Sequence, residues 1–234
     1  MHTAFVLAAS ITDLGAARAA RPHADIVEYR LDRSADGVDA LRSYEGVLPV
    51  LATNRVEREG GKAAATPARL DTLETAVELP AVAAVDVELS AIRNGRAGRV
   101  VDRARAHDVA VVVSVHDFEA TPDRKRLRRL LRAADEHGDI AKLAVTAERP
   151  GDVLDLLAVT HELSTAGVPL ATVAMGEVGR HSRAVTPLYG SRLGYAPVDP
   201  ADATAPGQYD LETLRTLLDQ LRGTPPDRPL RSTK

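Results

Sequence analysis

The sequence of 234 residues contains no cysteine, which excludes disulfide bonds and thiolate ligands for a metal. The absence of cysteine fits a reducing compartment. The apolar segment 4–9 is too short for a signal peptide and lacks its basic flank, and no stretch approaches the roughly 18 apolar residues of a transmembrane helix. We therefore expect a cytoplasmic protein without a membrane partner.

Aromatic residues make up only 3% of the chain, and the formal net charge is −3. One basic run, 124–132, could suggest nucleic-acid binding. Its leucines share one helical face, however, and the aromatic residues on which a single strand would stack are scarce. We interpret the run as the solvated outer face of a helix and expect no nucleic-acid partner.

Lysine is also rare, with four residues at positions 62, 125, 142 and 234 against 26 arginines. Lys142 lies in an apolar, strand-like run, 140–145. Burial disfavours the ammonium form, so a lysine in such a place can act as an amine nucleophile and form a Schiff base with a carbonyl substrate. The alternative is a lysine whose stem is buried while its head reaches solvent at a strand end.

Strand-like runs alternate along the chain with segments whose apolar residues recur at helical spacing. The strand-like runs are 3–9, 24–31, 47–53, 82–89, 109–115, 140–145, 169–175 and 193–198. Helical spacing occurs within 70–77, 100–104, 127–134, 153–157 and 211–221. Eight units of about 25–30 residues consume the chain, which favours a single (β/α)8 TIM barrel, an α/β fold, over an open sheet. We assign the barrel to residues 1–223 and a disordered C-terminal tail to 224–234.

Polar residues stand at the carboxyl ends of several predicted strands, where barrel enzymes place their reactive groups. Glu28 and Arg30 share one face of the second strand, where they can pair and still bind a polyhydroxylated ligand, or serve only as a salt bridge that closes the barrel. The loop after the third strand contains Gly60 and Gly61, which permit unusual backbone angles and close approach to a ligand. A charged surface loop explains that segment equally well.

His116 ends the fifth strand, one strand away from Lys142. An imidazole at the mouth of a barrel can move protons near neutral pH, although a lone histidine is more often structural. The loops 179–183 and 204–208, after the seventh and eighth strands, have the composition of binding loops.

Together these segments resemble one family, the type I 3-dehydroquinate dehydratases of the shikimate pathway of aromatic amino acid biosynthesis. The resemblance covers essentially the whole barrel. It is carried by Asp25-x-x-Glu28-x-Arg30-x-Asp32, Arg55-x-x-x-Glu59-Gly60-Gly61, Ser114-x-His116-Asp117-Phe118, Lys142 within its strand, Ser182-Arg183 and Ala205-Pro206-Gly207-Gln208. It implies a hydro-lyase that converts 3-dehydroquinate to 3-dehydroshikimate and water as a homodimer, with no metal or organic cofactor.

The resemblance also implies a role for each matching position. Lys142 matches the Schiff-base lysine, His116 the general acid/base, and Glu59 the carboxylate that assists the histidine. Arg183 resembles the partner of the substrate carboxylate. Other matching positions imply contacts with the substrate ring, hydroxyls or carboxylate end, namely Glu28, Arg30, Arg55, Met175, Thr204 and Gln208. Thr204 departs from the serine of many members, keeping the hydroxyl but adding a methyl group.

Two other functions fit the same barrel. A Schiff-base aldolase would use Lys142 to cleave a C–C bond, usually in phosphorylated substrates. No clear glycine-rich phosphate site follows the last two strands, although Gly176 and Gly179 keep this alternative open. A non-catalytic barrel could bind a pathway metabolite as a sensor, but a binding protein does not need the lysine.

Overall fold

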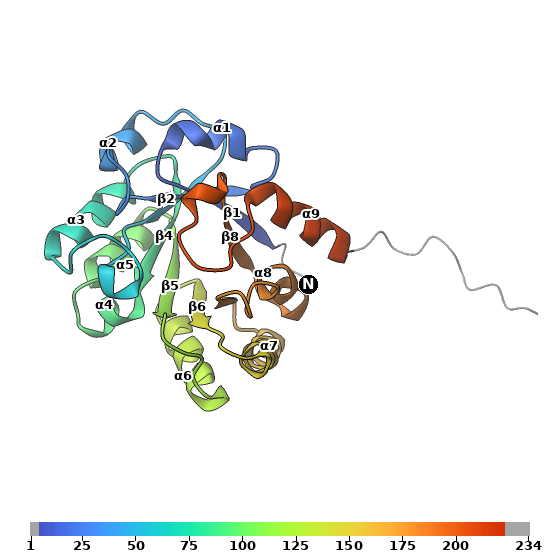
Figure 1. Cartoon of the computed structure of the whole chain (residues 1–234). Coiled ribbons are helices and arrows are strands. Elements are labelled where there is room, and N and C mark those ends of the chain that lie inside the picture. The colour runs from blue at the N-terminus through green and yellow to red at the C-terminus, as the bar shows by residue number, and fades with distance from the viewer. Residues whose placement is uncertain (1–4, 223–234) are drawn as a thin grey trace, which may run out of the picture.

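The computed structural model describes residues 5–222 and confirms the predicted barrel of parallel strands surrounded by helices (Figure 1). The strands are β1 (Val6–Ile11), β2 (Ile26–Arg30), β3 (Val50–Thr53), β4 (Val82–Glu88), β5 (Ala110–Asp117), β6 (Ile140–Thr146), β7 (Leu170–Met175) and β8 (Leu193–Pro197). Their order in the sheet is β7-β6-β5-β4-β3-β2-β1-β8, and every neighbouring pair is parallel. The Arg192 amide donates to the Leu170 carbonyl at 2.8 Å, which links the β8 side to β7 and nearly closes the barrel.

All eight predicted strands overlap an observed strand, and the five predicted helices are present within the described range. The α-helices are α1 (Ala17–Ala20), α2 (Gly37–Arg42), α3 (Pro67–Ala76), α4 (Leu89–Arg93), α5 (Gly98–Ala106), α6 (Arg124–Asp135), α7 (Pro150–Thr165), α8 (Ser182–Val185) and α9 (Leu211–Arg222). Short 3-10 helices occur at Leu14–Ala16, Glu57–Glu59, Thr186–Tyr189 and Pro200–Asp202. The predicted tail, 224–234, lies outside the described residues.

Two of the helix starts are capped by the acidic residues that the sequence suggests. The Asp123 carboxylate accepts from the Arg126 amide at 2.7 Å, and the Asp210 carboxylate accepts from the Thr213 amide at 2.9 Å. Each bond satisfies a backbone donor that has no partner within its helix.

Alternation along the strands separates the apolar core from the polar interior of the barrel. Val27 and Tyr29 of β2 face the helices and belong to the main hydrophobic core, and Glu28 and Arg30 face the other way. A second apolar cluster fills part of the barrel interior and consists of Ala8, Leu51, Ala84, Val112, Ala171 and Leu193. Because this cluster lies toward the amino ends of the strands, the inward polar side chains gather at the carboxyl ends.

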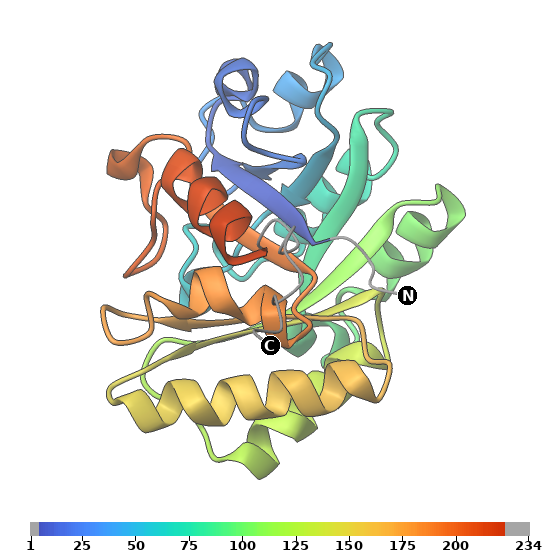
Figure 2. The ribbon, with the colours of Figure 1, turned by 90° about the vertical axis from the view of Figure 1, so that its right-hand side faces the viewer.

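The basic run 124–132 lies on α6, with Leu127 and Leu131 buried. Arg124 and Arg128 form ion pairs with Asp155 and Glu162 of α7, at 2.7 and 2.6 Å, and both helices pack on the same side of the barrel (Figure 2). Most basic residues of the run are exposed, as the interpretation of a solvated outer face predicts, and two of them pair with the neighbouring helix.

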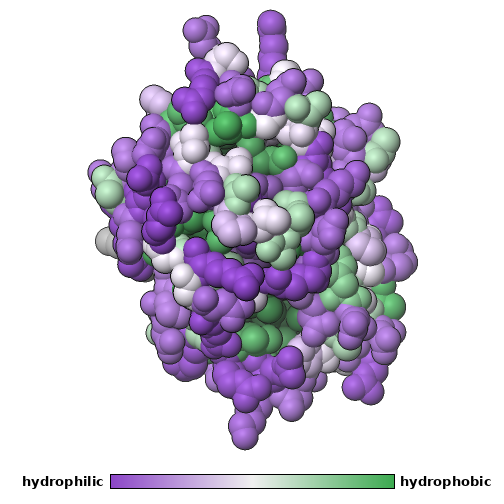
Figure 3. All heavy atoms as spheres, turned by 90° about the vertical axis from the view of Figure 1, so that its left-hand side faces the viewer, coloured by the Kyte–Doolittle hydropathy of each residue, from purple (hydrophilic) through white to green (hydrophobic). Residues whose placement is uncertain are grey.

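The surface over the helices that follow the first strands is mainly hydrophilic, with hydrophobic residues in small areas between polar ones (Figure 3). Among residues 5–222, no helix combines the length and the hydropathy needed to cross a membrane.

Candidate active site

A pocket at the carboxyl ends of the strands brings together all ten side chains that the sequence singled out. They are Glu28, Arg30, Arg55, Glu59, His116, Lys142, Met175, Arg183, Thr204 and Gln208. Strands β2, β5, β6 and β7 and the loops after β3, β7 and β8 supply them. Gly60, Phe118, Ala144, Val173, Tyr195 and Ala205 complete the lining.

Lys142 points from β6 into the barrel and does not reach bulk solvent. Its Nζ donates to Asp86 Oδ2 at 2.9 Å and lies 3.9 Å from the centroid of the Tyr195 ring. The residue is only 7% exposed. The structure therefore contradicts the alternative of a lysine that carries its charge to solvent at a strand end.

Asp86 is the partner of Lys142 that the sequence interpretation missed. This fully buried carboxylate on β4 also accepts from Ser114 Oγ at 2.6 Å and pairs with Arg55 Nη2 at 2.6 Å. Burial alone would raise the pKa of Asp86, but the charges of Arg55 and Lys142 outweigh burial and lower it far below its usual value. Asp86 is therefore a permanent negative charge beside the lysine nitrogen.

His116 and Glu59 form the second reactive group of the pocket. His116 Nδ1 lies 3.2 Å from Glu59 Oε2, and Ser90 Oγ donates to Glu59 Oε1 at 3.0 Å. Burial, reinforced by the positive charges of Arg55 and Lys142, lowers the pKa of His116 well below its usual value. Burial raises the pKa of Glu59, partly opposed by Arg55. With a proton on Nδ1 donated to Glu59, the imidazole is neutral and presents an unprotonated Nε2.

Arg55 is held inside a network of acidic groups. Its guanidinium contacts Asp86, Glu88 at 3.2 Å and Ser114 at 2.6 Å, and the two carboxylates raise its pKa despite burial. Arg69 pairs with Glu88 at 2.9 Å from the other side. Arg55 lines the pocket, but most of its donors serve this network.

Glu28 and Arg30 do not pair with each other, which contradicts the alternative of a salt bridge that closes the barrel. Glu28 accepts from the hydroxyls of Ser10 and Thr53, at 2.6 and 3.0 Å. Arg30 forms a bidentate pair with Asp32, at 2.9 and 2.7 Å. Ser10 is directly opposite Glu28 on the neighbouring strand, so Glu28 bonds with residues of the adjacent strands rather than with the next inward residue of its own strand.

The loops after β7 and β8 are joined through Arg183. Its Nε and Nη2 donate to the carbonyls of Gly207 and Pro206, at 3.0 and 3.1 Å. Burial lowers the pKa of Arg183 to about 10, and no carboxylate of residues 5–222 pairs with it. Arg183 thus places an uncompensated positive charge at the pocket, a site suited to an anion.

Gln208 organises the same loop that carries Thr204. Its side-chain oxygen accepts from the backbone amides of Thr204 and Ala205, at 2.7 and 3.1 Å. Met175, which is only 1% exposed, adds an apolar wall from the end of β7. These three residues line the pocket from the Arg183 side of the barrel.

The glycine pair after β3 is needed for the path of the chain. Gly60 has φ of 80°, a conformation that favours glycine, as the sequence suggested. A Cβ on Gly61 would lie 1.8 Å from the carbonyl oxygen of Arg55. The close approach at Gly61 is therefore to the protein backbone, and it fixes the short helix that carries Glu59.

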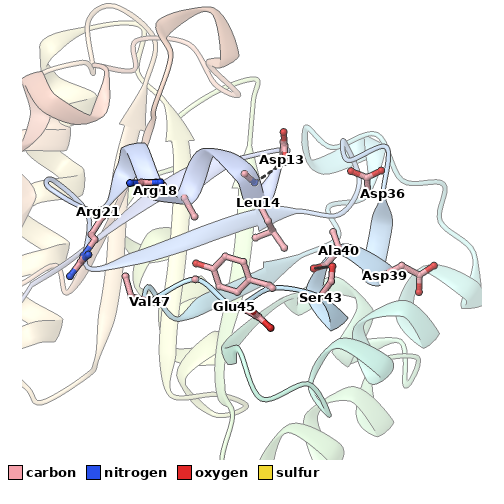
Figure 4. Close-up of a pocket in the computed structure, with 14 residues that line it drawn as sticks. Asp13, Leu14, Arg18, Arg21, Asp36, Asp39, Ala40, Ser43, Glu45 and Val47 are labelled. Carbon is pink, nitrogen blue, oxygen red and sulfur yellow. Dashed lines mark hydrogen bonds between the residues drawn. The ribbon is translucent and has the colours of Figure 1, made fainter.

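A larger cleft lies outside the barrel, around the 3-10 helix Leu14–Ala16 and α2 (Figure 4). Labelled side chains there include Asp13, Arg18, Asp36 and Glu45, which lie apart around its rim. The cleft has neither lysine nor histidine in its lining. Within residues 5–222, no group of three or more His, Asp or Glu side chains is arranged to hold a metal ion. The barrel pocket is the candidate active site because it contains the buried amine of Lys142, the His116–Glu59 pair and Arg183, which has no carboxylate partner within residues 5–222.

Comparison with known proteins agrees with this geometry. A sequence model of the family described as type I 3-dehydroquinase matches residues 7–225. The 3-dehydroquinate dehydratase of Haloarcula marismortui is 55% identical over 221 residues, covering 93% of this chain and 96% of the relative. That of Halobacterium salinarum is 51% identical, covering 93% and 98%. The crystal structure of 3-dehydroquinate dehydratase from Geobacillus kaustophilus superposes with a TM-score of 0.84 at 32% identity, covering 94% of this chain and 92% of that chain.

The family match spans nearly the whole barrel, and the relatives are similar in sequence, length and fold. The same barrel places a buried lysine, an imidazole–carboxylate pair and an unpaired arginine around one pocket. The chain belongs to the type I 3-dehydroquinase family.

Proposed function

We propose that the protein is a 3-dehydroquinate dehydratase of the shikimate pathway, in which Lys142 forms a Schiff base with the substrate. The family match and the names of the relatives support the hydro-lyase activity. The observation that carries the assignment of the lysine is its burial in the wall of the pocket, beside Asp86, in a pocket that also contains a histidine that is neutral at pH 7.

The first step joins the enzyme and the substrate. Lys142, as the neutral amine, adds its nitrogen lone pair to the ketone carbon of 3-dehydroquinate. The resulting carbinolamine takes a proton from solvent on its hydroxyl and loses water to give a protonated imine. The positively charged imine withdraws electrons from the carbon bonded to the imine carbon. The proton on that adjacent carbon becomes acidic enough for a side chain to remove it.

Elimination then needs a base and an acid. The unprotonated Nε2 of His116 takes the proton next to the imine, and the electron pair moves onto the imine nitrogen to give an enamine. The enamine returns its electrons as the β-hydroxyl leaves, and His116 gives its proton to that oxygen to form water. Glu59 orients the imidazole and stabilises its charged form. Hydrolysis of the product imine releases 3-dehydroshikimate and restores the amine.

The remaining side chains bind and orient the substrate. Arg183 pairs with the substrate carboxylate, because its charge has no acidic partner among the described side chains. Gln208 uses its oxygen on the loop, which leaves its amide nitrogen for a substrate hydroxyl. Further contacts with the ring and its hydroxyls come from Glu28, Arg30, Arg55, Thr204 and Met175.

A direct assay tests the activity. Purified protein mixed with 3-dehydroquinate should generate the ultraviolet absorbance of the conjugated enone product without added metal or cofactor. Absence of that signal under conditions where the protein is folded would overturn the assignment.

Arg183→Ala should weaken productive binding of the substrate. Loss of one charge-assisted contact costs about 1.5–3 kcal/mol, or roughly 10- to 150-fold in kcat/KM. Steady-state kinetics beside a thermal melt will measure it. Arg129→Ala, an exposed arginine of α6, is the matched control. Arg180 is unsuitable as a control because its guanidinium lies 4.3 Å from the Tyr209 ring.

If Arg183→Ala converts substrate with unchanged kcat/KM, the carboxylate is bound elsewhere. If its activity falls only in proportion to a collapse of the melting temperature, Arg183 acts through the two loop carbonyls that it holds, and the assigned role is wrong.

Activity should persist as pH falls through about 6.5. An ordinary histidine gains a proton there, but burial and nearby cations lower the pKa of His116 well below that value, so its imidazole stays neutral and able to act as a base. We expect kcat, which reports the groups that titrate in the enzyme–substrate complex, to be flat between about pH 8 and about pH 6.5 and to fall only at lower pH. An acid limb of the kcat profile centred at or above 6.5 would contradict the assignment of His116 as the base.

We also propose that the enzyme is a homodimer, as the family resemblance implies, and that it acts in the cytoplasm. Light scattering after size-exclusion chromatography should give twice the chain mass of 24.9 kDa. A single-chain mass across the concentrations used in the assay would exclude the dimer.

A further inference from the structure

Tyr195 places its aromatic ring beside the proposed nucleophile. It extends from β8, and Lys142 Nζ lies over its ring, 3.9 Å from the centroid. The ring borders the apolar cluster inside the barrel on one side and the active-site pocket on the other. Tyr195 therefore forms part of the floor beneath the lysine nitrogen.

Two different contacts favour a positive charge at that nitrogen. Asp86 Oδ2 accepts from Nζ at 2.9 Å, and the electron-rich face of the Tyr195 ring lies within the distance at which aromatic rings attract cations. Lys142 and Asp86 are buried and Tyr195 is half-buried, and such attractions are stronger there than at an exposed surface. The arrangement fixes the direction of the lysine side chain.

The hydroxyl of Tyr195 contributes differently from the ring. It is fully buried and has no hydrogen-bond partner among residues 5–222. Burial, reinforced by the negative charges of Asp86 and Glu28, raises the pKa of Tyr195 well above its usual value. The phenol is thus a poor proton donor at neutral pH, and the ring face is the part that contacts the lysine.

We infer that the ring of Tyr195 positions Lys142 and stabilises the positive charge that the same nitrogen carries in the imine intermediate, and that the hydroxyl is dispensable. The inference rests on the proposed Schiff-base function of Lys142. The elimination requires the imine to be protonated, so a contact that keeps the proton on that nitrogen should increase kcat. The ring lies below the nitrogen, so substrate affinity should depend on it much less.

Two substitutions separate the ring from the hydroxyl. Tyr195→Phe keeps the aromatic face, and we expect kcat within about twofold of the parent enzyme. Tyr195→Leu keeps an apolar side chain but removes the aromatic face. We expect kcat to fall about 5- to 30-fold, with KM nearly unchanged and slower trapping of the imine by borohydride.

A fluorinated series gives a readout that packing alone would not move. Phenylalanine with no, two or three ring fluorines at position 195 keeps nearly the same shape while the negative potential of the ring face decreases. We expect the logarithm of kcat to fall stepwise along the series while the melting temperature stays constant. This series also decides the question if Tyr195→Leu does not fold.

The possible outcomes are distinct. A flat fluorinated series, wild-type kcat in a folded Tyr195→Leu protein, or a loss in Tyr195→Phe as large as that in Tyr195→Leu would overturn the inference. If the parent enzyme itself neither dehydrates the substrate nor traps an adduct on Lys142, the proposed function fails. If it does both while all Tyr195 variants behave like the parent, only the role of Tyr195 fails.

Discussion

Lys142→Ala should abolish turnover of 3-dehydroquinate. Removing the amine removes the covalent intermediate and its electron sink, and losing a covalent nucleophile typically costs an enzyme on the order of 10⁴-fold or more in kcat. Lys142 is also the partner of Asp86 at 2.9 Å, so the melting temperature must be measured beside the activity. The control is Lys125→Ala, because Lys125 is exposed on α6 and lies outside the pocket.

Chemical trapping identifies the residue independently of turnover. Borohydride added with substrate or product should inactivate the parent enzyme and leave one covalent adduct, because reduction converts the imine to a stable amine. Peptide mapping is simple in a chain with four lysines. The adduct should fall on Lys142 and be absent from Lys142→Ala. An adduct on Lys62 or Lys125, or none at all, would refute the mechanism.

The elements that the sequence predicted well are those long enough to repeat a pattern. The strands are mainly apolar runs of four to eight residues, and the helices α3, α5, α6, α7 and α9 show helical spacing. The short helices α1, α2, α4 and α8 were not predicted. Each has four to six residues, too few for periodicity to stand out.

The candidate site was predictable where a residue type is rare or stands at a strand end. Lys142 and His116 meet these conditions. Asp86 does not, because it lies within a run that looks like a buried strand, and its partner Lys142 is 56 residues away. One signal of an inward polar position was available in the sequence. Asp86 and Glu88 are two residues apart and lie on the same face of β4, just as Glu28 and Arg30 do on β2.

The partners of the buried charges could not be predicted because they come from neighbouring strands and distant loops. Glu28 finds Ser10 and Thr53 on the adjoining strands rather than Arg30 two residues along. Arg183 finds two backbone carbonyls of the loop after β8. Sequence spacing gives the face of a strand on which a side chain lies, but the sheet register decides which group it meets.

His116→Ala should still form the lysine adduct but turn over far more slowly. Imine formation uses the amine, whereas His116 is assigned to the proton transfers that follow it. A positioned acid/base contributes roughly 10²–10⁴-fold, so kcat should fall by that factor while borohydride trapping on Lys142 remains. Single-turnover kinetics will separate the two steps. The matched control is His107→Ala, an exposed histidine at the end of α5.

Glu59→Gln then tests whether the carboxylate works through the imidazole. Glutamine keeps a similar size but cannot offer a negative charge to His116, whose Nδ1 lies 3.2 Å from Glu59. A charge-assisted hydrogen bond contributes about 1.5–3 kcal/mol, so kcat should fall roughly 10- to 150-fold. If Glu59 acts only by supporting His116, adding Glu59→Gln to His116→Ala should cause little further loss. Near wild-type turnover of His116→Ala would instead show that another group is the base, and equal, additive losses would show that Glu59 acts on the substrate directly.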